Sequence, residues 1–171
     1  MANDRNIINK RPRCRMAQKS DAVELTRLRW QLISDDNDSP IDTEFSRECH
    51  SWFLETISSN RWLLAVADTS VNTLAGCMCL QIVDGVPDKN GSCNRWGYLT
   101  NCYVDKPERN KKIGETLLRK ILSLSTDMSL ELVLVWPSTR AVNFYRRAGF
   151  ENTNLVHSAD GDEAPLEFFI G

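Results

Sequence analysis

The order of the predicted elements indicates a mixed α+β fold. Two amphipathic segments near the N-terminus precede three apolar, β-branched segments with short connections, which predicts an antiparallel meander. A strand at 95–104, a helix from residue 113 and a strand at 130–136 then form a crossover unit, whose two strands are expected to be parallel. The length of 171 residues suits a single domain, 1–171, in which we expect 1–12 to be a flexible segment.

The first predicted elements are a short strand over 14–17 and a helix over 20–33. Apolar residues recur along the helix at intervals of three and four, so that they line one face. Asp21 and Glu24 have the spacing of a capping box at its start. The polar run 35–40 contains a proline and is expected to end the helix.

The second predicted helix spans 41–58 and leads into the meander. The predicted strands cover 61–68, 73–84 and 95–104, and a loop rich in Gly, Pro and Asn over 85–94 separates the last two. The residues expected on the apolar face of the second helix are Phe45, Cys49, Trp52 and Ile57.

The C-terminal part predicts one long helix, one short helix and three strands. The long helix begins at residue 113 and ends near 125–126, and the buried-type strand 130–136 follows it. A short helix over 138–150 is stopped by a glycine. The last strands are predicted at 150–158 and 165–171, joined by an acidic turn.

The composition excludes several classes of protein. Hydrophobic residues make up 42% of the chain and charged residues 26%, as in ordinary globular proteins. The net charge of −2 argues against a nucleic-acid binder that relies on a basic surface. No apolar run approaches the ~18 residues of a membrane span, and the polar, basic first fifteen residues lack the core of a secretory signal. We therefore expect a cytoplasmic protein with free cysteine thiols.

Cys77 and Cys79 are the two cysteines closest to a metal-binding spacing. They lie in a predicted strand, where alternation directs both side chains to one face. No second cysteine pair follows, and the chain has two histidines. Small buried thiols are favoured over a zinc site, and no metal is predicted.

The stretch "VDKPERNKKIGETLL" marks the point where a predicted strand leads into a helix. The first N–H groups of a helix have no intrahelical partner, and together with the helix dipole they suit a phosphate. Arg109, Lys111 and Lys112 add positive charge there, while Gly114 allows a ligand to approach the backbone. These features are typical of a pyrophosphate cradle; a solvated loop with several cations is the alternative.

Two motifs resemble those of the GCN5-related N-acetyltransferase (GNAT) superfamily. The family's cofactor motif, Arg/Gln-x-x-Gly-x-Gly/Ala, is matched by "RNKKIG" at Arg109 and Gly114, whereas Lys112 replaces the usual glycine. The second signature, Asn-x-x-Ala-x-x-x-Tyr followed by Gly-Phe, is similar to "STRAVNFYRRAGF", with Ser138 in place of the asparagine. Its matching residues are Ala141, Tyr145, Gly149 and Phe150. The order of elements from 14 to 171 also resembles that family.

The resemblance implies a mostly antiparallel sheet, flanked by helices and splayed between its fourth and fifth strands. Acetyl-CoA would enter the splay. Main-chain groups of Cys102 and Val104 would pair with its pantetheine arm like an added strand, and main-chain N–H groups of 109–114 would hold the pyrophosphate. The residues that the resemblance assigns to acetyl-CoA are Cys102, Tyr103, Val104, Arg109, Asn110, Lys111, Lys112, Ile113, Gly114, Ser138 and Ala141.

The implied reaction is transfer of an acetyl group from the CoA thioester to an amine. A main-chain N–H near Cys102 or Tyr103 would stabilise the negative charge on the carbonyl oxygen. Tyr145 matches the family's general acid by position, and a phenol of pKa ~10 can donate to a thiolate whose conjugate acid has a pKa of ~8.5. A core tyrosine on an amphipathic helix is the alternative role for Tyr145.

A general base is missing from the strand over 95–104, which contains neither a carboxylate nor a histidine. An ε-amine of pKa ~10.4 is only about 0.04% neutral at pH 7, against about 10% for an α-amine of pKa ~8. We therefore expect a weakly basic primary amine. The resemblance to small-molecule and antibiotic-modifying branches of the family implies that this amine belongs to a small molecule of antibiotic or aminoacyl type. The candidates for a proton relay or for substrate contact are Tyr98, Thr100 and Asn101. Trp30 is a candidate for an aromatic wall of the acceptor site, although core packing would also explain this tryptophan.

Three other functions remain open at the level of the sequence. One is acetylation of protein or peptide N-termini, the second is acyl-CoA sensing without turnover, and the third is a structural or regulatory module that no longer binds CoA. Relatives in the family are often dimers, and exposed strand edges near the C-terminus would permit a homodimer.

Overall fold

A computed structural model describes residues 13–34, 39–69, 73–87, 89, 94–153 and 165–170. The segment expected to be flexible, 1–12, lies outside these residues, as does the acidic turn between the last two predicted strands. The strands form one mixed sheet in the order β1-β2-β3-β4-β5-β7-β6. Neighbouring strands are antiparallel except for the parallel pair β4–β5, as the crossover prediction requires.

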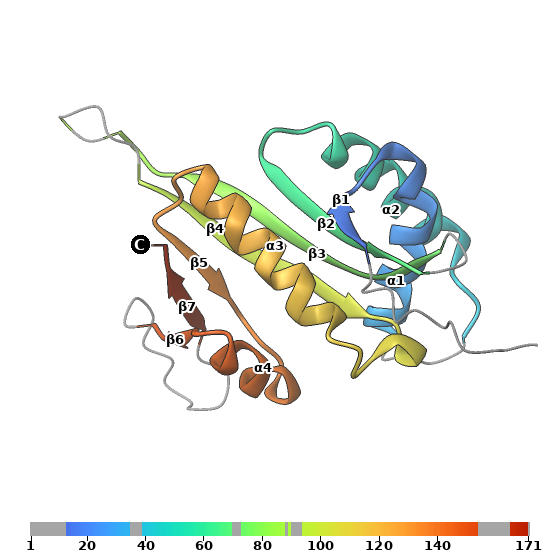
Figure 1. The fold of residues 1–171 in the computed structure, drawn as a ribbon. Helices are drawn as coiled ribbons and strands as arrows, with labels where there is room; N and C mark the ends of the chain where they lie inside the picture. The colour runs from blue at the N-terminus through green and yellow to red at the C-terminus, as the bar shows by residue number, and fades with distance from the viewer. Residues whose placement is uncertain are drawn as a thin grey trace, which may run out of the picture.

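The observed elements follow the predicted order (Figure 1). The strands are β1 Cys14–Met16, β2 Trp62–Asp68, β3 Leu74–Asp84, β4 Arg95–Val104, β5 Leu132–Val135, β6 Glu151–Asn152 and β7 Leu166–Phe169. The helices are α1 Ala22–Ile33, α2 Thr43–Ile57, α3 Ile113–Asp127 and α4 Val142–Arg147. The predicted helix over 138–150 is shorter than expected, because its first residues, Thr139–Ala141, form a 3₁₀ turn.

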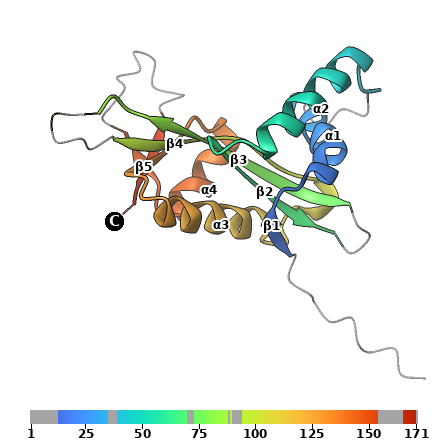
Figure 2. The same cartoon turned by 90° about the horizontal axis from the view of Figure 1, so that it is seen from above.

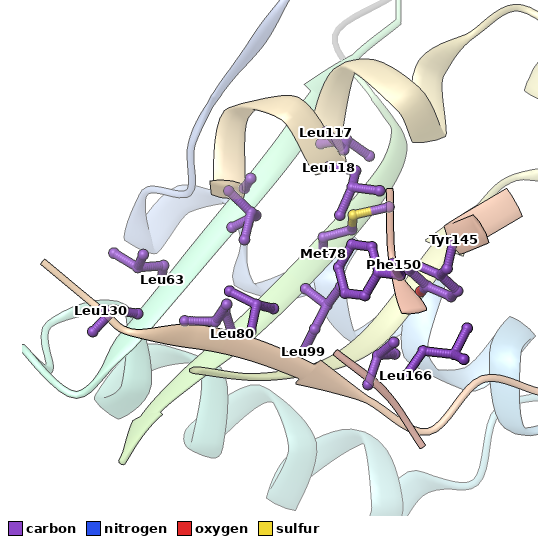
Figure 3. Packing of buried hydrophobic residues seen from close by; sticks show 14 of the residues in the cluster. Leu63, Met78, Leu80, Leu99, Leu117, Leu118, Leu130, Tyr145, Phe150 and Leu166 are labelled. Atoms are coloured by element: carbon purple, nitrogen blue, oxygen red, sulfur yellow. The ribbon is translucent and has the colours of Figure 1, made fainter. Parts of the chain in front are cut away.

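Helices cover both faces of the sheet. Figure 2 shows α1 and α2 on one face and α3 on the other. Ile113, Leu117 and Ile121 repeat at helical spacing and bury the inner side of α3. They pack with residues of β2–β5, with Tyr145 of α4 and with Phe150, which follows α4, in the cluster of Figure 3. A second cluster joins α1 and α2 to the opposite face, so each face of the sheet has its own core.

The buried side of α2 differs from the predicted one. Phe53 and Thr56 are its buried residues, and Cys49 and Ile57 are half-buried beside them. Trp52, which was expected on the apolar face, is 41% exposed. The helix is rotated so that Phe53 packs against the sheet, and the side of α2 that carries Trp52 stays open.

Asp21 does not act as the predicted cap, because its side chain bonds no N–H of the first turn of α1. Its carboxylate instead forms two bonds with the Arg15 guanidinium, at 2.7 and 2.9 Å, and accepts from the Gln18 N–H at 2.7 Å. Arg15 also bonds Asp68 on β2. The Arg15 hydrogen bonds are the main cause that lowers the pKa of Asp21. The network ties β1 and β2 to the start of α1.

The sheet opens between β4 and β5, as expected. Pairing of the two strands covers Gly97–Leu99 on β4 and Val133–Val135 on β5. Beyond Leu99 the register between β3 and β4 shifts: Cys79 faces Thr100, yet Cys77 faces Tyr103. Two residues of β4 therefore oppose a single residue of β3, which is a β-bulge. Within the bulge Asn101 has a φ of 49°. The bulge bends β4 away from β5 where a ligand would enter.

Candidate active site

A cavity of about 570 Å³ lies where the bulged end of β4, the N-terminus of α3 and α4 meet. Its volume falls in the range of small-molecule and cofactor sites. All but one of the residues that the sequence assigned to acetyl-CoA line it, together with the predicted acid. These residues are Cys102, Tyr103, Val104, Arg109, Asn110, Lys112, Ile113, Gly114, Ser138, Ala141 and Tyr145.

The N-terminus of α3 forms one wall of the cavity. Asn110 and Lys112 have φ angles of 65° and 61°, and Lys112 is the N-cap of α3 in the left-handed region. The first N–H groups of a helix lack intrahelical partners, so those that open α3 are available to an anion. A β-carbon on Gly114 would lie 3.4 Å from the Phe144 ring, so α3 and α4 approach closely there.

The cations of this segment have different roles. Arg109 donates from Nε to the Val104 carbonyl at 3.0 Å, and its guanidinium carbon lies 5.6 Å from the centre of the Tyr103 ring. It therefore fixes the turn that follows β4. Lys111 bonds Glu108 at 3.1 Å and, unlike the other assigned residues, is not a lining residue of the cavity. Lys112 lines the cavity and is exposed.

A residue with a β-carbon is strained at position 112, where the family has glycine. We expect Lys112→Gly to be more stable than Lys112→Ala by about 1 kcal/mol, since alanine keeps the left-handed penalty that glycine avoids. Both variants lose the same charge, so both should weaken acetyl-CoA binding by the same factor of about two to five. Thermal unfolding with and without acetyl-CoA measures the two effects; equal stability of the two variants would contradict the strain.

Several lining residues were not singled out from the sequence. Arg140 and Arg147 add two cations to the cavity, and Met78, Phe144 and Leu32 add apolar surface. The helical period was a signal for Arg140 and Arg147, which are seven residues apart, about two turns. Positive charge beside free N–H groups, with an apolar floor, fits a ligand that combines phosphates with a long chain.

Tyr145 lies at the inner end of the cavity, on α4. Its side chain is only 3% exposed and packs edge-on against Phe144 and Phe150, with ring centres 5.0 and 5.4 Å away. Its hydroxyl lies near the Cys102 thiol, which lines the same cavity. Burial, followed by the neighbouring Cys102, raises the pKa of Tyr145 above its ordinary value, and burial also raises the pKa of the Cys102 thiol. The tyrosine therefore stays protonated at neutral pH.

The other side of the bulge faces a second cavity, of about 450 Å³, between α1, α2 and β4. Thr100 and Asn101 line this cavity, whereas Cys102 and Tyr103, the next two residues, line the first one. The Asn101 side chain lies on the α1/α2 face, where its amide nitrogen approaches the sulfurs of Cys77 and Cys79 at 3.8 and 3.5 Å. Adjacent residues of the bulge therefore line two different cavities.

Two candidate substrate residues lie apart from Thr100 and Asn101. Tyr98 stacks edge-on against Trp136, with ring centres 5.5 Å apart, where β4 still pairs with β5. Trp30 lines a third cavity, between α1 and α2, and its indole N–H donates to the Ser39 carbonyl at 3.0 Å. It still touches an aromatic residue of the second cavity, because its ring centre is 5.2 Å from that of Phe45.

The described residues offer neither a metal-binding cluster nor a helix that could span a membrane. They contain no group of three or more His, Cys, Asp or Glu side chains placed to hold a metal ion. Cys77 and Cys79 are both buried in the second core cluster, on the same face as predicted. Among the described helices, none combines the length and the apolar character needed to cross a bilayer.

Solved structures of acetyltransferases have a similar fold. A predicted acetyltransferase from Clostridium acetobutylicum, solved with acetyl-CoA, superposes with a TM-score of 0.69 at 21% identity, covering 86% of this chain and 95% of that one. Glucosamine-6-phosphate N-acetyltransferase from Arabidopsis thaliana gives a TM-score of 0.68 at 20% identity, covering 88% and 98%. A GNAT-family acetyltransferase from Staphylococcus aureus Mu50 gives 0.68 at 19% identity, covering 93% and 99%.

No curated protein sequence matches the chain significantly. The family comparison is decisive, because the model of one family matches residues 25–150, from α1 to the Phe150 that follows α4. This range includes both motifs on which the resemblance was based, the cofactor turn before α3 and the tyrosine helix α4. The chain therefore belongs to the acetyltransferase (GNAT) family.

Proposed function

We propose that the chain acetylates the primary amine of a small molecule by direct attack on acetyl-CoA, with Tyr145 as the general acid. Family membership supplies the coarser part: the chain is an acetyltransferase that uses acetyl-CoA. One observation carries the rest. A single cavity contains the N-terminus of α3, the bulged end of β4 and the Tyr145 side chain.

The residues of the first cavity fit acetyl-CoA. Main-chain N–H groups of 110–114 would bind the pyrophosphate, supported by the side chains of Lys112, Arg140 and Arg147. Main-chain groups of Cys102 and Val104, beyond the last β4–β5 pair, would bind the pantetheine arm as an added strand. The arm would thereby carry the thioester toward Tyr145.

The thioester supplies an activated carbonyl carbon and a sulfur leaving group. A main-chain N–H at Cys102 or Tyr103 would face the negative charge that develops on the carbonyl oxygen. The Tyr145 hydroxyl would donate its proton to the departing sulfur, and the proton that the attacking amine releases would restore the hydroxyl, so that the step ends with a neutral amide, the CoA thiol and protonated Tyr145. Met78 and Phe144 would limit access of water to the reacting atoms.

The proposal is tested first by binding and then by turnover. Acetyl-CoA at 100 times its dissociation constant should stabilise the protein by about 2.7 kcal/mol, which raises Tm by about 5–10 °C for a chain of this size. Thiol release from acetyl-CoA should then depend on an added amine. An unchanged Tm at saturating acetyl-CoA would refute the donor site, and stabilisation without amine-dependent thiol release would instead indicate a sensor.

A further inference from the structure

The cavity of about 450 Å³ between α1, α2 and the bulge of β4 has a lining that is specific enough to name a ligand class. We propose that it binds the acceptor, and that the acceptor is a primary amine on an aromatic or bulky apolar body that also carries a carboxylate. An aromatic α-amino acid has this chemistry. The inference rests on the function proposed above and deepens it by naming the substrate class.

The position of the cavity suits an acceptor. Thr100 and Asn101 line it, and the adjoining Cys102 lines the cavity that contains Tyr145. Leu32 of α1 lines the first cavity, the one proposed to bind acetyl-CoA, so the first cavity extends toward the α1 face of the sheet. An amine held beside Asn101 would approach the thioester across the unpaired end of β4, where β5 has ended its pairing at Val135.

An aromatic wall forms the apolar part of the cavity. Trp52 packs edge-on against Trp62, with ring centres 5.1 Å apart, and Phe45 lines the same cavity. Trp52 is 41% exposed although it is large and apolar. Since aromatic faces bind flat or bulky apolar groups by stacking and burial, this wall favours an aromatic body over a polyamine or a sugar.

A cation lies at the bulge end of the cavity. One terminal nitrogen of Arg29 is 3.4 Å from the Asn101 side-chain oxygen, a long hydrogen bond. Within the described part of the chain, Arg29 has no carboxylate within 4 Å, whereas Arg27, on the same helix, pairs with Glu24 and Asp105. Because no carboxylate of the described residues lies within 4 Å of Arg29, its guanidinium suits the carboxylate of a ligand, which it can hold through two parallel bonds.

The cavity also has one acidic residue in its lining, the exposed Glu48 of α2. Among the described residues Glu48 has no ion-pair partner, so its charge is available to attract an ammonium group on approach. Glu48 would therefore act on approach, whereas Arg29 would hold the carboxylate once the amine lies beside Asn101. The third cavity, which contains Trp30 and Arg47, has no β4 residue in its lining and is therefore separated from the bulge.

A four-amine comparison tests this assignment. Thiol release from acetyl-CoA is measured with L-phenylalanine, 2-phenylethylamine, L-alanine and spermidine. L-Phenylalanine should give the highest kcat/KM. The analogue without a carboxylate should be about 10–100-fold slower, the factor that corresponds to a charge-assisted hydrogen bond. L-Alanine, which lacks the body, and spermidine, which lacks both features, should also be slower.

Variants separate the two features of the acceptor. Arg29→Gln should lower kcat/KM for L-phenylalanine about 10–100-fold but leave 2-phenylethylamine unchanged. Trp52→Ala should raise KM for both aromatic amines, and Trp52→Phe should restore it. Arg47→Gln removes an exposed arginine from the third cavity and serves as the matched control, with no effect expected. Unchanged Tm values confirm that the variants fold.

The outcomes distinguish this inference from the proposed function. If spermidine or L-alanine has the same kcat/KM as L-phenylalanine, the inference is overturned. The same holds if Arg47→Gln has a larger effect than Arg29→Gln. In both cases the proposed acetyltransferase function still stands. If no amine in the panel reacts while acetyl-CoA still raises Tm, the inference is overturned and the donor site stands. If acetyl-CoA does not raise Tm, the proposed function fails; calorimetric titration of L-phenylalanine alone into wild type and Arg29→Gln then decides the inference.

Discussion

Tyr145→Phe is expected to lower kcat by about 10²–10⁴-fold, the usual contribution of a positioned general acid. The affinity for acetyl-CoA should change little, because the assigned contacts of the cofactor are main-chain groups and cations rather than the phenol. Removal of the hydroxyl leaves the packing against Phe144 and Phe150 in place, so the free energy of unfolding should change by no more than about 1 kcal/mol. Thiol release and acetyl-CoA titration measure the two quantities.

The pH dependence of the rate gives a second test of the role of Tyr145. An acid works in its protonated form, and burial raises the pKa of Tyr145, so the active form persists above the ordinary range of a tyrosine near pH ~10. The rate should therefore show no alkaline loss from Tyr145 as the pH rises to that value. Tyr98→Phe, a matched change at a tyrosine that stacks on Trp136, should retain full kcat. A Tyr145→Phe variant with wild-type kcat would exclude the acid role.

Gly76→Ala should destabilise the protein and weaken acetyl-CoA binding at the same time. A β-carbon on Gly76 would lie 2.6 Å from the Tyr103 carbonyl oxygen and 3.2 Å from the Val104 α-carbon, so the backbone of β4 must move. Overpacking of this kind costs about 1–3 kcal/mol, which lowers Tm by about 2–12 °C in a chain of this length. The displaced segment is the one assigned to the pantetheine arm.

Gly85→Ala is the control for this prediction. Its β-carbon would also meet a carbonyl oxygen at 2.6 Å, that of Asn94, but at the opposite end of the β3–β4 pair. Both variants should lose stability, and only Gly76→Ala should bind acetyl-CoA more weakly. Equal acetyl-CoA affinity in the two variants would show that the arm does not depend on the backbone at Tyr103.

Local chemistry was enough to predict the elements and most of the residues that line the first cavity. The apolar period of α3, the strand character of β2–β4 and the cationic turn before α3 are all properties of neighbouring residues. The two motifs, with a strand between them, then led to the correct family. The strand–helix junction was predictable because the free N–H groups of a helix start do not depend on distant parts of the chain.

Features that depend on packing were predicted less well. The sequence placed Trp52 on the buried side of α2, whereas contacts with the sheet select Phe53 and leave Trp52 open. Asp21 has the spacing of a cap, yet Arg15 competes for its carboxylate through a tertiary ion pair. A bulge at Asn101 has no clear local signal, since asparagine also tolerates a positive φ in ordinary turns.

The amino-acid sequence by itself determined which segments form helices and strands, and where a strand leads through a cationic turn into a helix, because periodicity and helix termini are local. Only the tertiary structure decided which side chains share a cavity. The β4 bulge directs Asn101 toward α1 and Cys102 toward Tyr145, and so divides one strand between two cavities. That division arises from pairing between strands and from packing of helices on both faces, which are interactions between residues far apart in the chain.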